Sequence, residues 1–439
     1  LLILFIFLTS CQSNSVNNHN FINNEIKLTT VINDKTPNLK LLPFEAKNAK
    51  KNIIKAVKFQ PSIQGLKQQL SLLKANKKGA LALKENQISF RGLGGIARSD
   101  QKNEIGGSAS FNLSRLLYDY GSTDQSIKSF DDRIKSGEYS LISQAEDLVL
   151  NGYQLWNNLY AQRKIVSIYK EGIALANPLI EQIDDIAGSG IADKATILRA
   201  KKEYFEIIKD MKSTEALEKN ISVQFMSFFN IKNSDRKVSS LKPFSVTNYN
   251  SLEKKMVQYS PFLKSQKFKI NSLERNLISL KARKKPNVSL NSALNTPFEN
   301  AIADSSASIG VNVNYIFNDG GQLDSQIESI SKQIKAELKI YESSVKELKQ
   351  NLKSSYESYV IALETRKALI DLIEISNEVR DTSKSQLVAG RSTLSDVLSA
   401  EVSVAKNQIA LINLEAQINS YTFIIRSLTS GLVPNVNWF

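Results

Sequence analysis

Few residues of this sequence could take part in catalytic or metal chemistry. The chain of 439 residues has one cysteine, Cys11, and one histidine, His19. This leaves no disulfide, no Cys/His zinc site and no plausibly placed Cys–His dyad, and the three methionines do not suggest a soft-metal cluster. His19 lies in an Asn-rich stretch, where we expect it to be solvated. The sequence therefore predicts a protein that is not an enzyme and needs no cofactor.

Cys11 has one further chemistry open to it, the attachment of lipid. It follows an apolar run at residues 1–8, which is too short for a bilayer of ~30 Å but fits the core of an export signal. Leu8 to Cys11 resemble the lipobox of bacterial lipoproteins, in which the cysteine is lipid-modified and becomes the mature N-terminus. We expect a signal peptide over residues 1–10 and a lipidated, flexible tether over residues 11–44, most of it rich in Asn, Ser and Thr. The alternative is a buried N-terminal strand with an incidental cysteine.

The positive charge of the chain does not form a nucleic-acid site. The net charge is +14, but the lysines are spread along helical segments and interleaved with Glu and Asp. The densest basic run, Lys281 to Lys285, stops at Pro286 and contains no aromatic side chain on which a base could stack. We interpret this run as a solvated helix end and predict no nucleic-acid partner.

The elements that carry these residues occur twice, at an offset of 200 residues. Three unrelated markers share this offset. The first marker is the proline that begins a helical stretch, Pro61 and Pro261. The second is an Asp–x–Gly motif, Asp119 with Gly121 and Asp319 with Gly321. The third is a glycine followed by a Leu and an Ala at matching positions, Gly190 and Gly390. The sequence therefore predicts a duplicated unit.

Each unit is predicted to contain very long helices. Residues 322–389 contain neither Gly nor Pro, and their apolar positions recur every 3.6 residues on average, so they form a rod of roughly 100 Å. Residues 122–187 have the same character, with a bend expected at Pro178. Gly190 and Gly390 are predicted to end these helices as helix-tip turns, after which residues 192–230 and 391–430 return as antiparallel helices.

Two strand pairs lie between the short and the long helices. The second pair alternates apolar residues such as Val311 and Val313 with small polar ones such as Asn312 and Asn314, and Phe111 and Leu113 alternate likewise in the first. An apolar face opposite a small polar face is what a water-filled membrane barrel requires. Because four strands cannot close a barrel, the predicted barrel is shared between chains.

These patterns give a domain division and a fold class. We expect a first structural repeat at 45–230, a connector at 231–250, a second repeat at 251–432 and a tail at 433–439. The fold class is mainly α with membrane β, in which tandem helix-hairpin repeats form a long antiparallel coiled-coil α-barrel. No apolar run after residue 8 approaches the length of a transmembrane helix.

Four features together resemble the TolC-like outer-membrane efflux protein family. They are the lipobox, the duplicated unit, the two Asp–Gly motifs at the start of the long helices, and Gly390 with Asp396-Val397-Leu398. The resemblance covers roughly residues 45–432. It implies a homotrimer whose chains share a twelve-stranded outer-membrane barrel continued by helices across the periplasm. It further implies a passive exit duct of a tripartite efflux or type I secretion system, with a periplasmic adaptor, an inner-membrane transporter and outer-membrane lipid as partners.

In that family, acidic residues at the helical tips form a ring at a periplasmic gate. Asp396 matches this position, whereas Ser399 stands where a second acid is frequent and Thr196 occupies the equivalent place in the first repeat. Asp193, Asp184 and Asp185 are possible substitutes. Asp396 has an alternative role as an acid that complements the helix dipole at a helix N-terminus.

Two other classes remain as alternatives to an exit duct. A periplasmic adaptor has one helical hairpin and a lipoyl-like β-domain, whereas this chain has two hairpins and no such domain. A lipid-anchored structural coiled-coil protein does not account for the alternating strands. The transported substrate is not encoded in these patterns, because the pump largely selects it.

Overall fold

The computed structural model describes residues 45, 48–99, 102–189, 194–232, 237–298 and 305–433. Cys11, the expected signal peptide and tether, and Gly190 lie outside these residues. The first repeat contains α2 (Ala49–Phe59), α3 (Pro61–Ala82), β1 (Gln87–Ser99), β2 (Lys102–Tyr118), α4 (Ser122–Ser189) and α5 (Lys194–Phe229). The second contains α6 (Tyr249–Tyr259), α7 (Pro261–Ala282), β3 (Asn287–Phe298), β4 (Ser306–Asn314), α8 (Gln322–Val388) and α9 (Leu394–Thr429).

The internal repeat extends to the boundaries of the elements. Each helix of the second repeat begins 200 residues after its counterpart, and even the N-caps agree, since Asn48 and Asn248 both accept a backbone N–H with their side chains. The predicted order of elements is confirmed, but the sequence did not predict the short helices α2 and α6. They end at Phe59 and Tyr259, and the residues that follow, Gln60 and Ser260, have ψ of 132° and 116°. The proline that begins the next helix disfavours the helical conformation at the residue before it.

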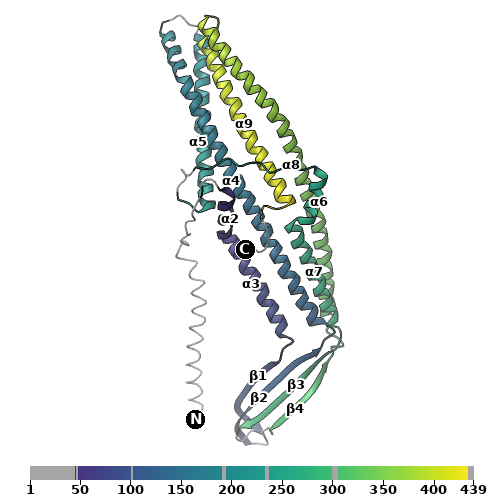
Figure 1. Cartoon of the computed structure of the whole chain (residues 1–439). Coiled ribbons are helices and arrows are strands. Elements are labelled where there is room, and N and C mark those ends of the chain that lie inside the picture. The colour runs from purple at the N-terminus through teal and green to yellow at the C-terminus, as the bar shows by residue number, and fades with distance from the viewer. Residues whose placement is uncertain are drawn as a thin grey trace.

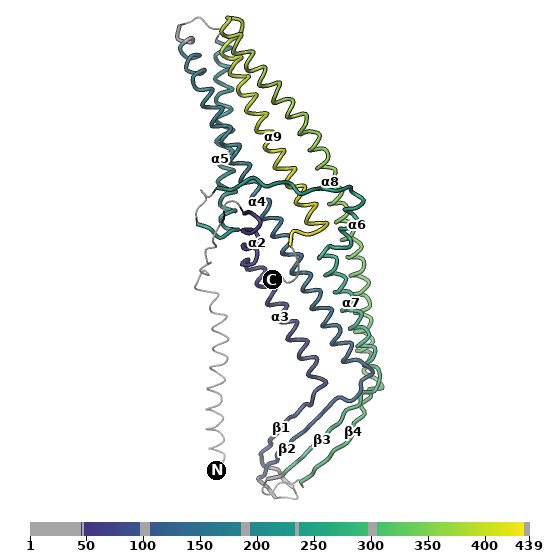
Figure 2. The backbone as a smooth tube through the Cα atoms, in the orientation of Figure 1, coloured from purple at the N-terminus to yellow at the C-terminus, as the bar shows by residue number. Residues whose placement is uncertain are grey.

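The molecule is a long rod with the sheet at one end (Figures 1 and 2). α4 and α8 run the whole length of the helical part, and α4, with 68 residues, spans roughly 100 Å. α3 and α7 pack beside them near the sheet, whereas α5 and α9 pack beside them in the distal half. α4 is continuous across Pro178, so the predicted bend there stays a prediction.

A seam of serines joins the two repeats where α4 packs against α7. Ser122, Ser129 and Ser136 are seven residues apart on α4 and face Ser279, Ser272 and Ser265 on α7. The hydroxyl of Ser279 donates to the Ser122 carbonyl at 2.8 Å, and that of Ser122 donates back to the Ser279 carbonyl at 3.1 Å. Ser129 and Ser136 donate to facing carbonyls at 2.8 and 2.9 Å. Hydroxyls reach the carbonyls of another helix only when small residues let the backbones approach closely.

The main hydrophobic core lies at mid-height, where α2, α4, α5 and α9 meet. Trp156 of α4 is completely buried there, its ring packs on Phe225 and Phe229, and its Nε1–H donates to the Ser239 carbonyl at 2.9 Å. This bond fixes the connector between the repeats across α4. Among the described residues, no helix is both long enough and apolar enough to span a membrane.

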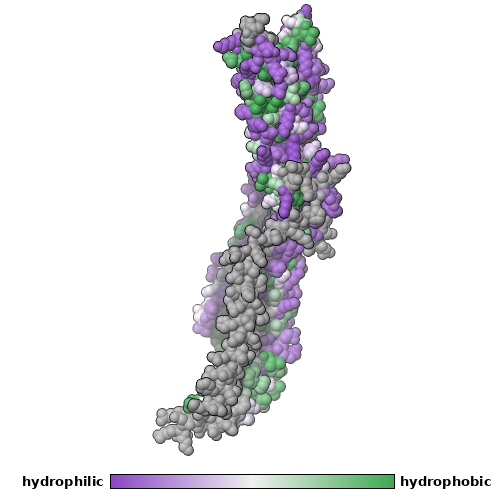
Figure 3. All heavy atoms as spheres, turned by 90° about the vertical axis from the view of Figure 1, so that its left-hand side faces the viewer, coloured by the Kyte–Doolittle hydropathy of each residue, from purple (hydrophilic) through white to green (hydrophobic). Residues whose placement is uncertain are grey.

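The side of the rod formed by α5 leaves apolar residues uncovered. Its distal half shows hydrophobic patches among hydrophilic residues (Figure 3). Leu198 and Phe205 contribute, with 57 and 62% of their surfaces exposed. A helix with an unpacked apolar stripe in the single chain is typical of a surface that is covered in an assembly.

Candidate functional site: sheet faces and helix tips

The four strands form one antiparallel sheet in the order β1-β2-β3-β4. The two repeats meet at the β2–β3 pair, where Ser114 lies opposite Asn291 and Phe111 opposite Leu294. Within the described residues, β1 and β4 each have one edge without a partner strand. Such edges readily pair with another chain.

One face of the sheet carries mainly short polar side chains and glycines. Ser89 pairs with Asn112, Ser289 with Asn312, and the Ser114 hydroxyl donates to Asn291 Oδ1 at 2.8 Å. Arg91 and Leu93 lie on the same face, and the alternating pattern of the sequence did not single them out. These side chains, Leu93 apart, suit contact with water.

The opposite face is apolar and uncovered. Phe111, Leu113, Val311 and Val313 lie on it together, as the strand pattern predicted. Ile309, Val311 and Val313 are 76, 62 and 62% exposed, and the Phe90 and Phe111 rings lie 4.9 Å apart. This face needs an apolar environment that the single chain does not supply.

Aspartates start the long helices at the edge of the sheet. Asp119 accepts the backbone N–H groups of Gly121 and Thr123, and Asp319 accepts those of Gly321 and Leu323, at 2.7 to 3.0 Å. Gly121 and Gly321 have φ of 79° and 85°, a conformation that glycine adopts without strain. The Leu323 N–H bond holds the pKa of Asp319 below its usual range. The Asp–Gly motif is therefore a helix start.

Aromatic residues missed by the sequence analysis surround this junction. The rings of Tyr118 and Tyr120 lie 4.7 Å apart, and those of Tyr315 and Phe317 lie 4.6 Å apart. Phe317 is 89% exposed, and Lys285 lies over the Tyr120 ring at 4.8 Å. The sequence pattern that could have identified them is the enrichment of aromatic residues at strand ends, which is usual at membrane–water interfaces.

At the opposite end of the molecule, Gly390 forms the turn between α8 and α9. Its φ is 71°, and the Arg391 N–H donates to the Gln386 carbonyl at 2.8 Å, which closes the end of α8. The corresponding Gly190 lies outside the described residues.

Asp396 is part of a capping box at the start of α9. Its Oδ2 accepts the Thr393 backbone N–H and hydroxyl, both at 2.8 Å, while its own N–H donates to the Thr393 hydroxyl at 3.2 Å. The Thr393 N–H bond lowers the pKa of Asp396, so the carboxylate is charged at neutral pH. The geometry of the single chain thus accounts for Asp396 as a helix-start acid, and its role at a gate stays a prediction.

Other acids near the tip are paired. Asp184 lies 2.5 Å from Lys201, Glu203 accepts the Ser399 hydroxyl at 2.6 Å, and the buried Glu401 pairs with Lys384. The sequence analysis did not single out Glu203 or Glu401. Asp193 lies outside the described residues. In the part of the chain that the structure describes, no cluster of three or more His, Cys, Asp or Glu could hold a metal ion.

Comparisons with known proteins agree with this geometry. Residues 254–427 match the family described as outer membrane efflux protein. Among similar solved structures, CusC has a TM-score of 0.76 and 12% identity, and the alignment covers 90% of this chain and 96% of CusC. VceC from Vibrio cholerae has a TM-score of 0.75 and 13% identity, with 87% of this chain and 96% of VceC covered. The CmeC channel from Campylobacter jejuni has a TM-score of 0.76 and 12% identity, with 89% of this chain and 88% of CmeC covered. A comparison with curated proteins gave no match.

The fold is that of solved outer-membrane channels. The match to the outer membrane efflux protein family lies within the second repeat, and the similarity in fold extends over both repeats. This match agrees with the prediction that the protein is not an enzyme.

Proposed function

We propose that this protein is the outer-membrane exit duct of a tripartite efflux or type I secretion system. The observation that carries the proposal is the sheet, which has one water-compatible face and one uncovered apolar face, and whose two edges have no partner strand among the described residues. It continues directly into helices of about 100 Å. Substrates would pass from a periplasmic adaptor and an inner-membrane transporter to the exterior.

Three copies would supply the missing strands. Four strands per chain give twelve in a trimer, and β4 of one copy would pair with β1 of the next. The repeat supports this arrangement because β2 and β3 already join a first repeat to a second one. The apolar face would then contact lipid and the Asn/Ser face would line the duct.

The helices support the same assembly. The serine seam residues Ser265 and Ser279 on α7 correspond to Gly65 and Gly79 on α3, 200 residues earlier. A Cβ added at Gly65 or Gly79 would meet no described atom of another element within 4 Å, so nothing among the described residues requires glycine there. A close seam like that between α4 and α7 needs small residues, so these glycines would suit packing of α3 against α8 of a neighbouring copy.

We further propose that Cys11 is acylated and that its lipid anchors the protein in the outer membrane. The support is the Leu8-Thr9-Ser10-Cys11 sequence. Replacing Cys11 by Ala should abolish labelling with radioactive palmitate and leave some duct function, because the barrel is held by its own apolar band. Labelling that persists in the variant would contradict the proposal.

The duct itself is tested by electrical recording. The purified full-length protein should form discrete conducting channels in planar bilayers, and deletion of its gene should sensitise the cell to a pumped compound or block a secreted protein. Absence of conductance from stable trimers would argue for a structural coiled-coil protein instead.

A further inference from the structure

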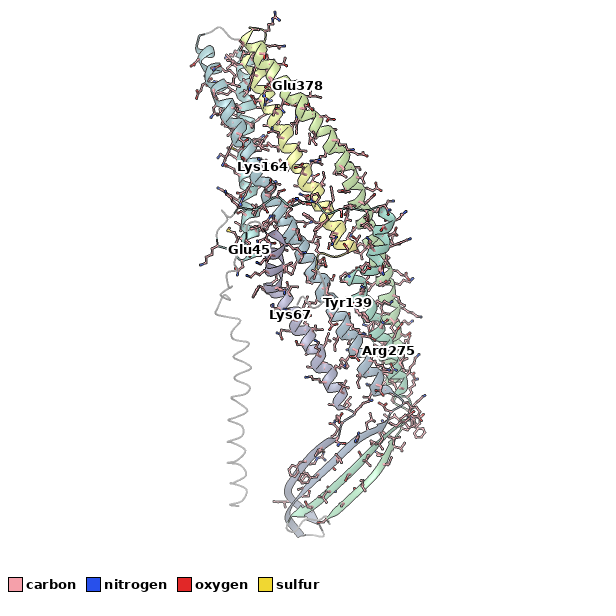
Figure 4. The ribbon with its side chains drawn as sticks, in the orientation of Figure 1. Glu45, Lys67, Tyr139, Lys164, Arg275 and Glu378 are labelled. Carbon is pink, nitrogen blue, oxygen red and sulfur yellow. The ribbon has the colours of Figure 1, made fainter. Side chains whose placement is uncertain are left out.

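A groove of about 850 Å³ lies at mid-height between α4, α5 and the connector. Tyr160, Val223, Met226 and Val238 give it an apolar lining, and lysines including Lys164 stand at its rim. Figure 4 labels Lys164 there, a short way above Glu45, which precedes α2.

In the second repeat, the equivalent surface of α9 is crossed by the connector. The Asn419 side chain donates to the Leu241 carbonyl at 3.3 Å, and the Phe244 N–H donates to the Thr422 hydroxyl at 3.2 Å. The Phe244 ring packs on Phe423 at 5.7 Å, and Phe423 is 1% exposed.

The same surface on α5 lacks its cover. Ser222 and Val223 stand 200 residues before Thr422 and Phe423. Ser222 is 4% exposed, yet its hydroxyl has no hydrogen-bond partner among the described residues, and Val223 is 59% exposed. A buried hydroxyl without a partner costs free energy, so a donor for it is expected.

The helix that precedes each groove sits in the same place. α6 packs through Met256 on Leu352 and Ile425. Their counterparts 200 residues earlier are Ala56, Gly152 and Phe225. Ala56 and Phe225 belong to the core under α2, and Gly152 contacts it. Ile53 and Phe228 fill the space beside Gly152, where an added Cβ would meet them at 2.8 and 2.9 Å. The chain entering α2 therefore approaches α5 as the chain entering α6 approaches α9.

The sequence before α2 repeats the sequence before α6. Leu41, Pro43, Phe44 and Asn48 are identical to Leu241, Pro243, Phe244 and Asn248. Residues 41–44 lie outside the described residues. We propose that they bind the groove on α5, with the Phe44 N–H donating to the Ser222 hydroxyl and the Phe44 ring covering Val223. The inference rests on the internal repeat and does not depend on the duct function.

A disulfide tests this contact in the full-length protein with Cys11 replaced by Ser. Phe44→Cys with Val223→Cys should form an intrachain disulfide, detected by mass spectrometry of the digest, because the proposed hydrogen bond from Phe44 to Ser222 would hold the two backbones close together. Phe44→Cys with Phe205→Cys is the matched control, since Phe205 is similarly exposed on α5 but about five helical turns away. Equal yields in both pairs would overturn the proposal. The proposal would also be overturned if the thiol at position 223 formed no disulfide and did not react with maleimide. Another occupant would then fill the groove.

Limited proteolysis gives a second readout that needs no new thiol. Phe44→Ala should raise the rate of tryptic cleavage at Lys40 and Lys47 by about fivefold or more, because cleavage follows the population of the undocked segment. Phe21→Ala, farther along the expected tether, should leave that rate unchanged. A rate that Phe44→Ala does not alter would overturn the docking.

Discussion

At the scale of single residues, Glu146 shows how burial in the fold shifts the pKa of a side chain. It is 5% exposed on α4, and its carboxylate accepts the N–H groups of Leu432 and Val433 at 2.7 to 3.0 Å, which holds the chain after α9 against α4. Burial outweighs these bonds and the nearby Arg426, and Asp147 adds repulsion, so the pKa of Glu146 rises to about 7.

Stability should therefore depend on pH through Glu146. Between about 4.5 and 7 the native state binds more protons than the unfolded state, so stability falls as pH rises through this window. The upper limit of the loss is roughly 3 kcal/mol. Melting temperatures of the purified protein at pH 5 and pH 8 should differ more for the wild type than for Glu146→Gln, whose amide does not titrate. An equal difference in both would show that Glu146 is not responsible.

Asp396 gives a prediction about ion selectivity. Three charged carboxylates around a trimer axis would attract cations, and their mutual repulsion would raise their pKa values from the lowered value of the single chain. Asp396→Asn should lower cation preference and block by multivalent cations in planar-bilayer recordings, with the trimer intact. Asp371→Asn, an exposed acid far from the tip, is the control. Unchanged selectivity would leave Asp396 as a capping residue, and Asp185→Asn would then be the next variant to record.

Residue roles were only partly predictable. The spacing of Asp119 and Asp319 identified them as repeat markers, but their capping role depends on backbone N–H groups that local sequence does not fix. Glu146 has no sequence signal, because its partner Leu432 is 286 residues away. Its pKa is set by burial in the folded protein, which no local sequence motif predicts.

At the scale of elements, the two faces of the sheet should tolerate charge differently. Val311→Arg would place a cation on the apolar face and should cost ~2 to 4 kcal/mol near mid-membrane. Asn312→Arg, on the neighbouring residue and the opposite face, should mainly change conductance. The amount of trimer in outer-membrane fractions and its urea midpoint measure the first effect, and single-channel current measures the second. Equal losses of trimer would argue against a lipid-facing surface.

The long helices and the strands were predictable because their periods of 3.6 and 2 persist over many residues. The short helices before Pro61 and Pro261 were not predicted, since each has only 11 residues, too few for a period of 3.6 to stand out. The serine seam was also missed. Ser129 and Ser272 look like surface residues in a helical sequence until the other helix is placed beside them.

At the scale of the whole molecule, the duplication predicts how copies meet. The β2–β3 pair joins the first repeat to the second within the chain. Three copies would form a closed ring of six similar repeats, in which the register of the β2–β3 pair would recur between β4 of one copy and β1 of the next. Ser114 pairs with Asn291 in the chain. Shifting each by 200 residues places Asn314 of one copy opposite Arg91 of the next.

This register can be tested by oxidative cross-linking. Asn314→Cys with Arg91→Cys should yield a covalent trimer on a denaturing gel, because directly paired residues of neighbouring strands lie within disulfide reach. Asn314→Cys with Leu93→Cys is the matched control, on the same face of β1 but two residues away, where the separation of about 7 to 8 Å disfavours the bond. Each single variant reports any contribution from Cys11. A stronger cross-link through Leu93 would show that the six units are not equivalent. If neither pair links chains, β1 and β4 do not meet, and the strands of one copy must close against something other than a second copy.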